Sequence, residues 1–125
     1  MSKTAIVVMS DPKSGGEEAL GRVFNALILA LSLKEKGADV DLSFQGTGTR
    51  WPRELAQPTH PANGLYEAVR DRISGVSGAC ADLFGAAADV SDMGLKLVRD
   101  RAMPGTEGLA DLSRHVAPDS ELVIF

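Results

Sequence analysis

The chain has 125 residues, a mass of 13.2 kDa and 44% hydrophobic residues, which suits one compact domain over residues 1–125 and rules out two. Its 13 basic and 17 acidic residues give a net charge of −4, which argues against a surface that neutralises nucleic-acid phosphates or anionic lipid. We therefore expect no nucleic-acid partner and no membrane partner.

The apolar runs are too short for a signal peptide or a membrane span. Residues 5–9 are apolar, but the run ends at Asp11 and Pro12. The longest apolar stretch, residues 23–33, falls short of the roughly 20 residues that cross a bilayer. We expect a cytoplasmic protein, and a reducing compartment also suits Cys80, the single cysteine. One cysteine excludes an internal disulfide and a four-cysteine zinc site, and we expect no bound metal.

Short β-branched runs alternate with helical patterns along the chain, as in a βα repeat. Residues 4–10 are typical of a strand buried on both faces of a parallel sheet. The run from Ser14 to Glu17 matches a capping box and predicts a helix over residues 16–36. The apolar face of this helix is wider than one sheet face covers. Two explanations stay open, which are packing under a neighbouring element and a subunit interface.

The second strand and the segment after it have different patterns. Apolar and polar residues alternate over residues 39–44, which predicts a half-exposed strand toward an edge of the sheet. Residues 45–61, rich in proline, are the longest irregular segment. They follow the carboxyl end of a strand, where open α/β sheets bind ligands. A helix over residues 64–73 is expected next.

The second half of the chain continues the alternation. We expect, in order, a strand at residues 74–79, a strand-to-helix turn with a short helix at 80–85, a strand at 95–99, a loop at 102–108, a helix at 109–115 and a strand at 121–125. Five strands with right-handed crossovers predict an α/β protein, a three-layer α/β/α sandwich around a mainly parallel five-stranded sheet.

Cys80 is the leading candidate for a reactive group. Free amides and the helix dipole at a strand-to-helix turn stabilise a thiolate, which is the reactive form of cysteine. Asp82, two residues on, acts in the opposite direction. A small inert core cysteine fits the pattern equally well. Of the two histidines, His115 ends a predicted helix, where a cation is favoured, and His60 lies in the long loop, either solvated or catalytic.

In the order of its features the chain resembles the DsrE/DsrF-like family of small sulfur-trafficking proteins, which includes TusD and the YchN-type proteins. The resemblance covers nearly the full length. It rests on the strand at residues 4–10, the long apolar helix, the Gly37-Ala38-Asp39-Val40 lead into the second strand, the Ser77-Gly78-Ala79-Cys80 turn followed by Gly85, and the strand at 121–125.

The resemblance implies that Cys80 carries sulfane sulfur as a persulfide, with Gly78 as the glycine of its turn and without any cofactor. It also implies sulfur donor and acceptor proteins as partners, and a homo-oligomer for which a trimer and a hexamer are the sizes to consider. The positions after the cysteine are often basic in members of the family, whereas this chain has Asp82 and Phe84.

Two functions follow as hypotheses. The first is a sulfur carrier, or a component of a sulfurtransferase, that acts through Cys80. The second is a non-catalytic, oligomeric small-ligand-binding module with a structural Cys80. Its site would be the 45–61 segment, where Arg50 and Trp51 offer charge and a stacking surface and His60 is a further binding residue.

Overall fold

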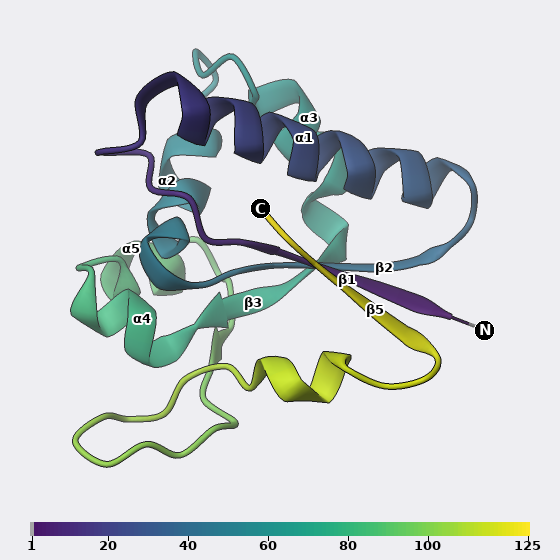
Figure 1. Ribbon diagram of the computed structural model, residues 1–125. Coiled ribbons are helices and arrows are strands. Elements are labelled where there is room, and N and C mark those ends of the chain that lie inside the picture. Colours follow the sequence, from purple (N-terminus) through teal and green to yellow (C-terminus); the bar gives the residue numbers. More distant parts are fainter. Residues whose placement is uncertain (1) are drawn as a thin grey trace.

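The computed structural model describes residues 2–125, which form a single parallel sheet with helices packed against it (Figure 1). The strands are β1 (Lys3–Val8), β2 (Asp39–Phe44), β3 (Ile73–Ser77), β4 (Leu97–Val98) and β5 (Ser120–Ile124). Their order is β4-β3-β2-β1-β5, and each neighbouring pair is parallel. The five expected strands are therefore confirmed, with ends that differ by a few residues.

The prediction that the second strand lies toward an edge is wrong, because β2 is the central strand of the sheet. Of its polar positions only Asp39, at the start of the strand, is exposed, and Asp41 is buried. Ser43 lies against the late segment that contains Leu112 and His115. The alternation of polar and apolar residues in β2 therefore reflects two sheet faces that pack against different elements, and not one buried and one solvent-exposed face.

Helix α1 (Gly16–Glu35) confirms the predicted long helix, but its start differs from the predicted capping box. The N-cap residue is Gly15, which has no side chain to bond the first turn. The Ser14 hydroxyl instead donates to Asp11 Oδ2 at 2.6 Å, and Asp11 Oδ1 accepts the Lys13 N–H at 2.9 Å. Asp11 organises this turn, and Ser14 lies one residue before the N-cap, so its hydroxyl does not cap the helix.

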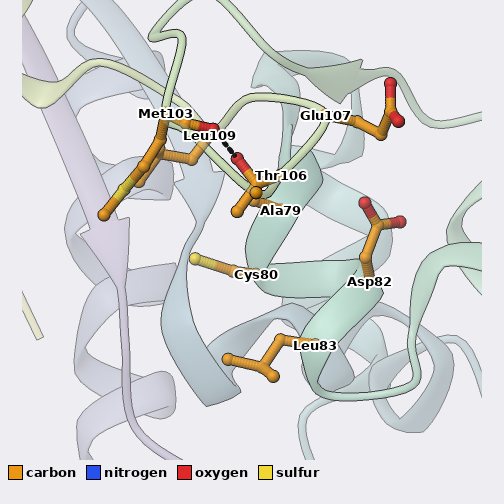
Figure 2. A pocket seen from close by; sticks show the side chains of 9 residues that line it. Ala79, Cys80, Asp82, Leu83, Met103, Thr106, Glu107 and Leu109 are labelled. Atoms are coloured by element: carbon orange, nitrogen blue, oxygen red, sulfur yellow. Dashed lines mark hydrogen bonds between the residues drawn. The ribbon is translucent and has the colours of Figure 1, made fainter.

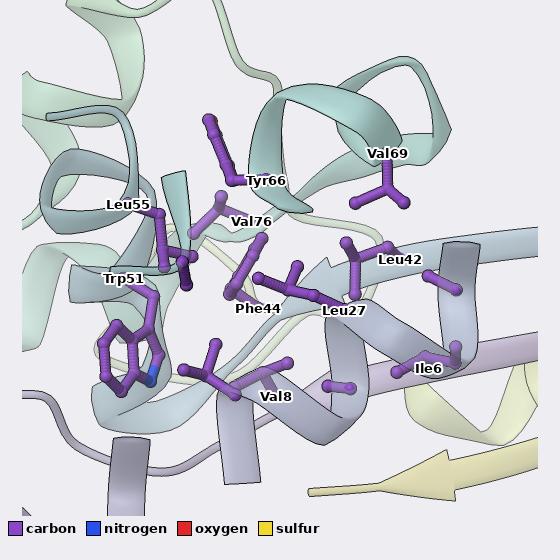
Figure 3. Close-up of a cluster of buried hydrophobic side chains, with 14 of the residues drawn as sticks. Ile6, Val8, Leu27, Leu42, Phe44, Trp51, Leu55, Tyr66, Val69 and Val76 are labelled. Atoms are coloured by element: carbon purple, nitrogen blue, oxygen red, sulfur yellow. The ribbon is translucent and has the colours of Figure 1, made fainter. Parts of the chain in front are cut away.

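The wide apolar face of α1 is covered by helix α3 (Asn63–Val69), which lies beside it on the same side of the sheet (Figure 1). Lys34 Nζ fixes the end of α1 to the end of α3, since it donates to Ala68 O at 2.8 Å and Asp71 Oδ1 at 2.7 Å. The first explanation, packing under a neighbouring element, is confirmed. Figure 3 shows the resulting core, where α1, α3 and the sheet bury Ile6, Val8, Leu27, Leu42, Phe44, Trp51, Leu55, Tyr66, Val69 and Val76.

The segment at residues 45–61 is more regular than predicted. It contains a 3₁₀ helix, η1 (Gly46–Arg50), and helix α2 (Trp51–Leu55). Gly48 lets η1 lie directly on the end of β1, because a Cβ there would be 2.2 Å from Val8 O. The helix expected over residues 64–73 is α3 followed by the 3₁₀ turn η2 (Arg70–Arg72). A regular, packed segment here fixes the shape of the carboxyl edge of the sheet.

Two short helices and a long crossing complete the fold. Helices α4 (Gly78–Leu83) and α5 (Ala87–Asp92) connect β3 to β4, and α5 was not predicted. The chain then crosses the other face of the sheet with the 3₁₀ helix η3 (Leu112–His115), which is shorter than the predicted helix (Figure 1). Helices on one face, the sheet, and η3 on the other form the three-layer α/β/α fold that the sequence predicted. No helix within residues 2–125 is long and apolar enough to cross a membrane.

Candidate functional site

Cys80 lies in the first turn of α4, immediately beyond the carboxyl end of β3. The predicted strand-to-helix turn is thus confirmed. The side chain is half-buried, and it points away from α4 into the space between Leu83 and Met103 (Figure 2). The sulfur is therefore not enclosed in the core, and a reaction partner has a direction from which to approach it.

The space in front of Cys80, called the Cys80 cleft below, has a volume of about 750 Å³. Residues of α4 form one wall, and the loop before η3 forms the other. Two large apolar side chains flank the sulfur with much of their surface in solvent, Leu83 at 76% and Met103 at 55%. The cleft is lined by Ala79, Cys80, Asp82, Leu83, Met103, Gly105, Thr106, Glu107 and Leu109.

The outer wall is a closed loop with its own hydrogen bonds. Arg101 and Leu109 pair as an antiparallel bridge at its base. Within it, the Thr106 hydroxyl donates to Met103 O at 2.8 Å. The Ala79 N–H donates to Gly108 O at 2.8 Å, which ties the loop to the start of α4. The expected loop at 102–108 is therefore an ordered wall that is bonded to the turn carrying Cys80.

A cation is present beside the cleft, although it is not one of the residues directly after Cys80 in the sequence. Arg99, just after β4, pairs with Asp82 through both guanidinium ends, at 2.9 Å from Nη1 to Oδ2 and 3.2 Å from Nη2 to Oδ1. The hydrogen bond from Arg99 lowers the pKa of the Asp82 carboxyl below its ordinary value. The negative charge of Asp82 next to Cys80 is thus compensated, which sequence analysis missed because Arg99 comes from another strand.

Gly78 and Gly85, on either side of Cys80, are each required for a different structural reason. At Gly78 a Cβ would lie 2.6 Å from Arg99 Cγ, so the absent side chain leaves room for Arg99 to cross the start of α4. Gly85 has φ of +73°, and it ends α4 in the left-handed conformation common at helix C-termini. The Ala86 N–H then bonds back to Ala81 O at 2.8 Å. The turn of Cys80 therefore depends on Gly78, and the length of α4 depends on Gly85.

Arg50, Trp51 and His60 do not line the Cys80 cleft. Arg50 bonds the Asp11 carboxylate and Phe84 O, at 3.2 and 3.1 Å, and its guanidinium lies 5.5 Å from the centre of the Phe84 ring. His60 Nδ1 accepts the Ala62 N–H at 3.0 Å, and its ring meets Trp51 edge-on. These contacts hold the 45–61 segment together.

The stacking role considered for Trp51 is wrong, because the residue belongs to the core. Its side chain is 3% exposed, and Nε1 donates to Ser10 O at 2.8 Å. The ring therefore has no free face for a planar ligand. The alternative function keeps Arg50 and His60 at the surface of the segment, but without an aromatic platform.

His115 also differs from the expectation of a cation at a helix end. It is buried under β2 on the crossing segment, and burial lowers its pKa below the ordinary value. The neutral imidazole is favoured there. Within residues 2–125, no three His, Cys, Asp or Glu side chains gather in a way that could hold a metal ion.

Comparison with known proteins defines the class of the fold. A solved structure of a conserved protein of unknown function from Bacteroides thetaiotaomicron matches with a TM-score of 0.61 and 18% identity, over 99% of this chain and 95% of that one. This likeness shows that the two proteins share one α/β fold.

By sequence, the chain is similar to an uncharacterized protein of Methanocaldococcus jannaschii. It is 32% identical over 78 residues, which is 62% of this chain, and the chain spans 63% of the length of that relative. No family model matches the chain.

Proposed function

We propose that the protein is a DsrE-like sulfur carrier, which holds sulfane sulfur as a persulfide on Cys80 and yields it to an acceptor thiol. The observation that carries this proposal is the half-exposed Cys80 sulfur, which points into an open cleft of about 750 Å³ at the carboxyl edge of the sheet. This edge is where parallel α/β sheets place their ligands.

The chemistry needs a thiolate, access and a partner. The Cys80 thiolate attacks the outer sulfur of a donor persulfide, a new sulfur–sulfur bond forms, and the donor leaves as a thiolate. An acceptor thiolate then attacks the outer sulfur on Cys80, which leaves Cys80 as a thiolate again. Each step is an exchange between sulfur atoms, so no external oxidant or reductant is consumed.

The surroundings of Cys80 support this exchange. Exposed Leu83 and Met103 provide apolar contact area on both sides of the sulfur for an incoming segment. Arg99 compensates the charge of Asp82, which lines the same cleft as the thiol. An uncompensated carboxylate at that position would disfavour the thiolate and persulfide anions.

The test is sulfur loading measured by intact mass spectrometry. We expect the protein to gain the mass of one sulfur atom when it is incubated with a persulfide donor, and to lose it when an acceptor thiol is added. Cys80→Ser abolishes the gain. In the matched control, Cys80→Ser is combined with Ser91→Cys, which moves the single thiol to the exposed surface of α5. Loading of this control as fast as wild type, or no loading of wild type, would refute the proposal.

A non-catalytic binding module is the competing function, and native alkylation separates the two. A carrier requires Cys80 to react in the folded protein, whereas a structural cysteine reacts only after unfolding. The half-exposed position of the sulfur favours the carrier.

The proposal also includes the cellular compartment, the partners and the assembly of the protein. A persulfide carrier works in a reducing compartment, the cytoplasm, with sulfur donor and acceptor proteins as partners, and self-association is part of the proposal. Size-exclusion chromatography with light scattering measures the assembly directly.

A further inference from the structure

The two edges of the sheet differ in length and in protection. At one edge, β4 contains only two residues, and short edge strands resist pairing with other chains. At the other edge, β5 contains five residues in unshifted register with β1. It has no proline, lysine or bulge, which often protect an edge, and its one charged residue is Glu121. Within residues 2–125, the outer side of β5 is contacted only at its start, where Ala117 forms an isolated bridge with Ser120, and the rest is unpaired.

The hydrogen bonds to β1 identify the backbone groups that face outward. Phe125 donates to Val7 O and accepts from the Met9 N–H, each at 2.8 Å, so Phe125 faces β1. Because alternate residues of a strand bond to opposite sides, Glu121 and Val123 also face β1. Ser120, Leu122 and Ile124 therefore direct their N–H and C=O groups away from the sheet.

The outward N–H and C=O groups of β5 can pair with the same groups of a second, antiparallel β5. The Ser120 N–H is already bonded to Ala117 O at 3.1 Å, which leaves two free donors, on Leu122 and Ile124. An antiparallel copy of β5, related by a two-fold axis at Leu122, offers acceptors at its own Leu122 and Ser120. Both donors in each chain then find a carbonyl in the other chain.

The side chains fit the same two-fold register. Ser120 lies opposite Ile124 of the second copy, and Glu121 lies opposite Val123, so the two carboxylates are not opposed. Ile124, which is 50% exposed, and Val116, which precedes the turn into β5 and is 70% exposed, supply apolar surface at this edge.

We propose that β5 is a dimer interface, which pairs antiparallel with β5 of a second copy of this chain and joins the two sheets into one. Such an interface is isologous, and each chain contributes the same strand. The inference is independent of the sulfur chemistry. It also places self-association at β5, whereas the sequence analysis considered a subunit interface at the first helix as one of two explanations.

The first test changes one edge residue and one matched residue elsewhere. Wild type is expected to be a dimer by sedimentation and light scattering. Ile124→Lys is expected to raise the dimer dissociation constant at least about tenfold, because it replaces apolar surface at the edge with a charge that pairing would desolvate. Ile28→Lys is the control, since Ile28 lies on α1 and is similarly exposed, at 47%. This variant should dimerise like wild type.

The second test measures the register, and it does not depend on a destabilising charge. In a Cys80→Ser background, Leu122→Cys places the two new thiols directly opposite each other, at a Cα separation of about 5.5 Å that a disulfide accepts. Mild oxidation should then link the dimer. Glu121→Cys, in the same background, should link poorly, because each Glu121 faces Val123 of the other copy.

Three results would overturn the proposal. They are a monomeric wild type, a dimer that Ile28→Lys breaks and Ile124→Lys does not, and equal cross-linking at positions 121 and 122. A monomer whose β5 instead captured an unrelated extended peptide would identify the edge as a heterologous site.

Discussion

The 45–61 segment and the Cys80 cleft follow the carboxyl ends of neighbouring strands, yet they use their chemistry-bearing side chains in opposite ways. Arg50, Trp51 and His60 bond to the protein itself and hold the segment in place. Cys80 has free space in front of it. Residue type alone therefore does not distinguish a ligand-binding loop from a packed one, and the free volume around the side chain does.

The largest effect should come from removing the anchor of the packed segment. Trp51→Ala is expected to lower the free energy of unfolding by about 3–5 kcal/mol, since it empties a core position and removes the bond to Ser10 O. Cys80→Ala, at the half-exposed position, should cost less than about 1 kcal/mol. Urea unfolding measures both. Equal losses would contradict the contrast between the two regions.

A smaller effect is expected at the glycine that shapes the cleft. Gly78→Ala should cost about 1–3 kcal/mol, because its Cβ would overlap the Arg99 side chain and force it to move. Gly64→Ala is the control. It lies in α3 with open space around it, and should stabilise the protein by about 0.5–1 kcal/mol. Thermal unfolding of both variants compares the two sites, and a harmless Gly78→Ala would show that Arg99 needs no such room.

Lowering the pH should reduce the stability of the protein through His115, which lies away from both the 45–61 segment and the Cys80 cleft. Burial holds the pKa of His115 below its ordinary value of 6.5, so its stabilising contribution is present above pH 6.5 and is lost as the pH falls through the lowered value. Stability should therefore decline between about pH 7 and pH 5. Asp11 and Asp82, whose hydrogen bonds lower their pKa values, stay ionised in this window. Urea unfolding of His115→Gln should show a weaker decline, and an identical decline would exclude His115 as its source.

The smallest expected effect concerns the charge beside the thiol. Arg99→Gln should slow alkylation of Cys80 by about two- to threefold, because the variant leaves the Asp82 carboxylate, which lines the same cleft, without its compensating cation. The partly exposed position of the pair keeps the effect modest. Arg22→Gln removes an equally charged partner from the α1 surface and serves as the control. Iodoacetamide kinetics at neutral pH compare the variants, and a faster reaction in Arg99→Gln would contradict the assigned role.

Much of the fold followed from local patterns. The Ile and Val run of β1, the apolar periodicity of α1 and the turn at Gly78 each predicted an element that the structure contains. These patterns reflect period and backbone preference, which act over a few residues. The capping box at Ser14 failed because the helix begins one residue later than predicted, with Gly15 as the N-cap and Ser14 bonded to Asp11 in the preceding turn.

The site was predicted only in part. The turn position of Cys80 was visible in the sequence, because a strand, a glycine and a short helix follow one another there. The outer wall of the cleft and the Arg99 partner of Asp82 were not visible. Both come from the segment after β4, and their approach to α4 depends on how that segment crosses the sheet.

By itself the sequence determined the succession of the five strands, the long helix α1 and the single thiol at a turn, because these depend on neighbouring residues. Only the tertiary structure decided that β2 is central, that Trp51 is buried and that Asp82 is paired. It also decided that Cys80 faces open space and that the outer side of β5 is unpaired beyond Ser120. These properties depend on which segments distant in sequence contact each other, and those contacts are determined by the packing of the whole chain.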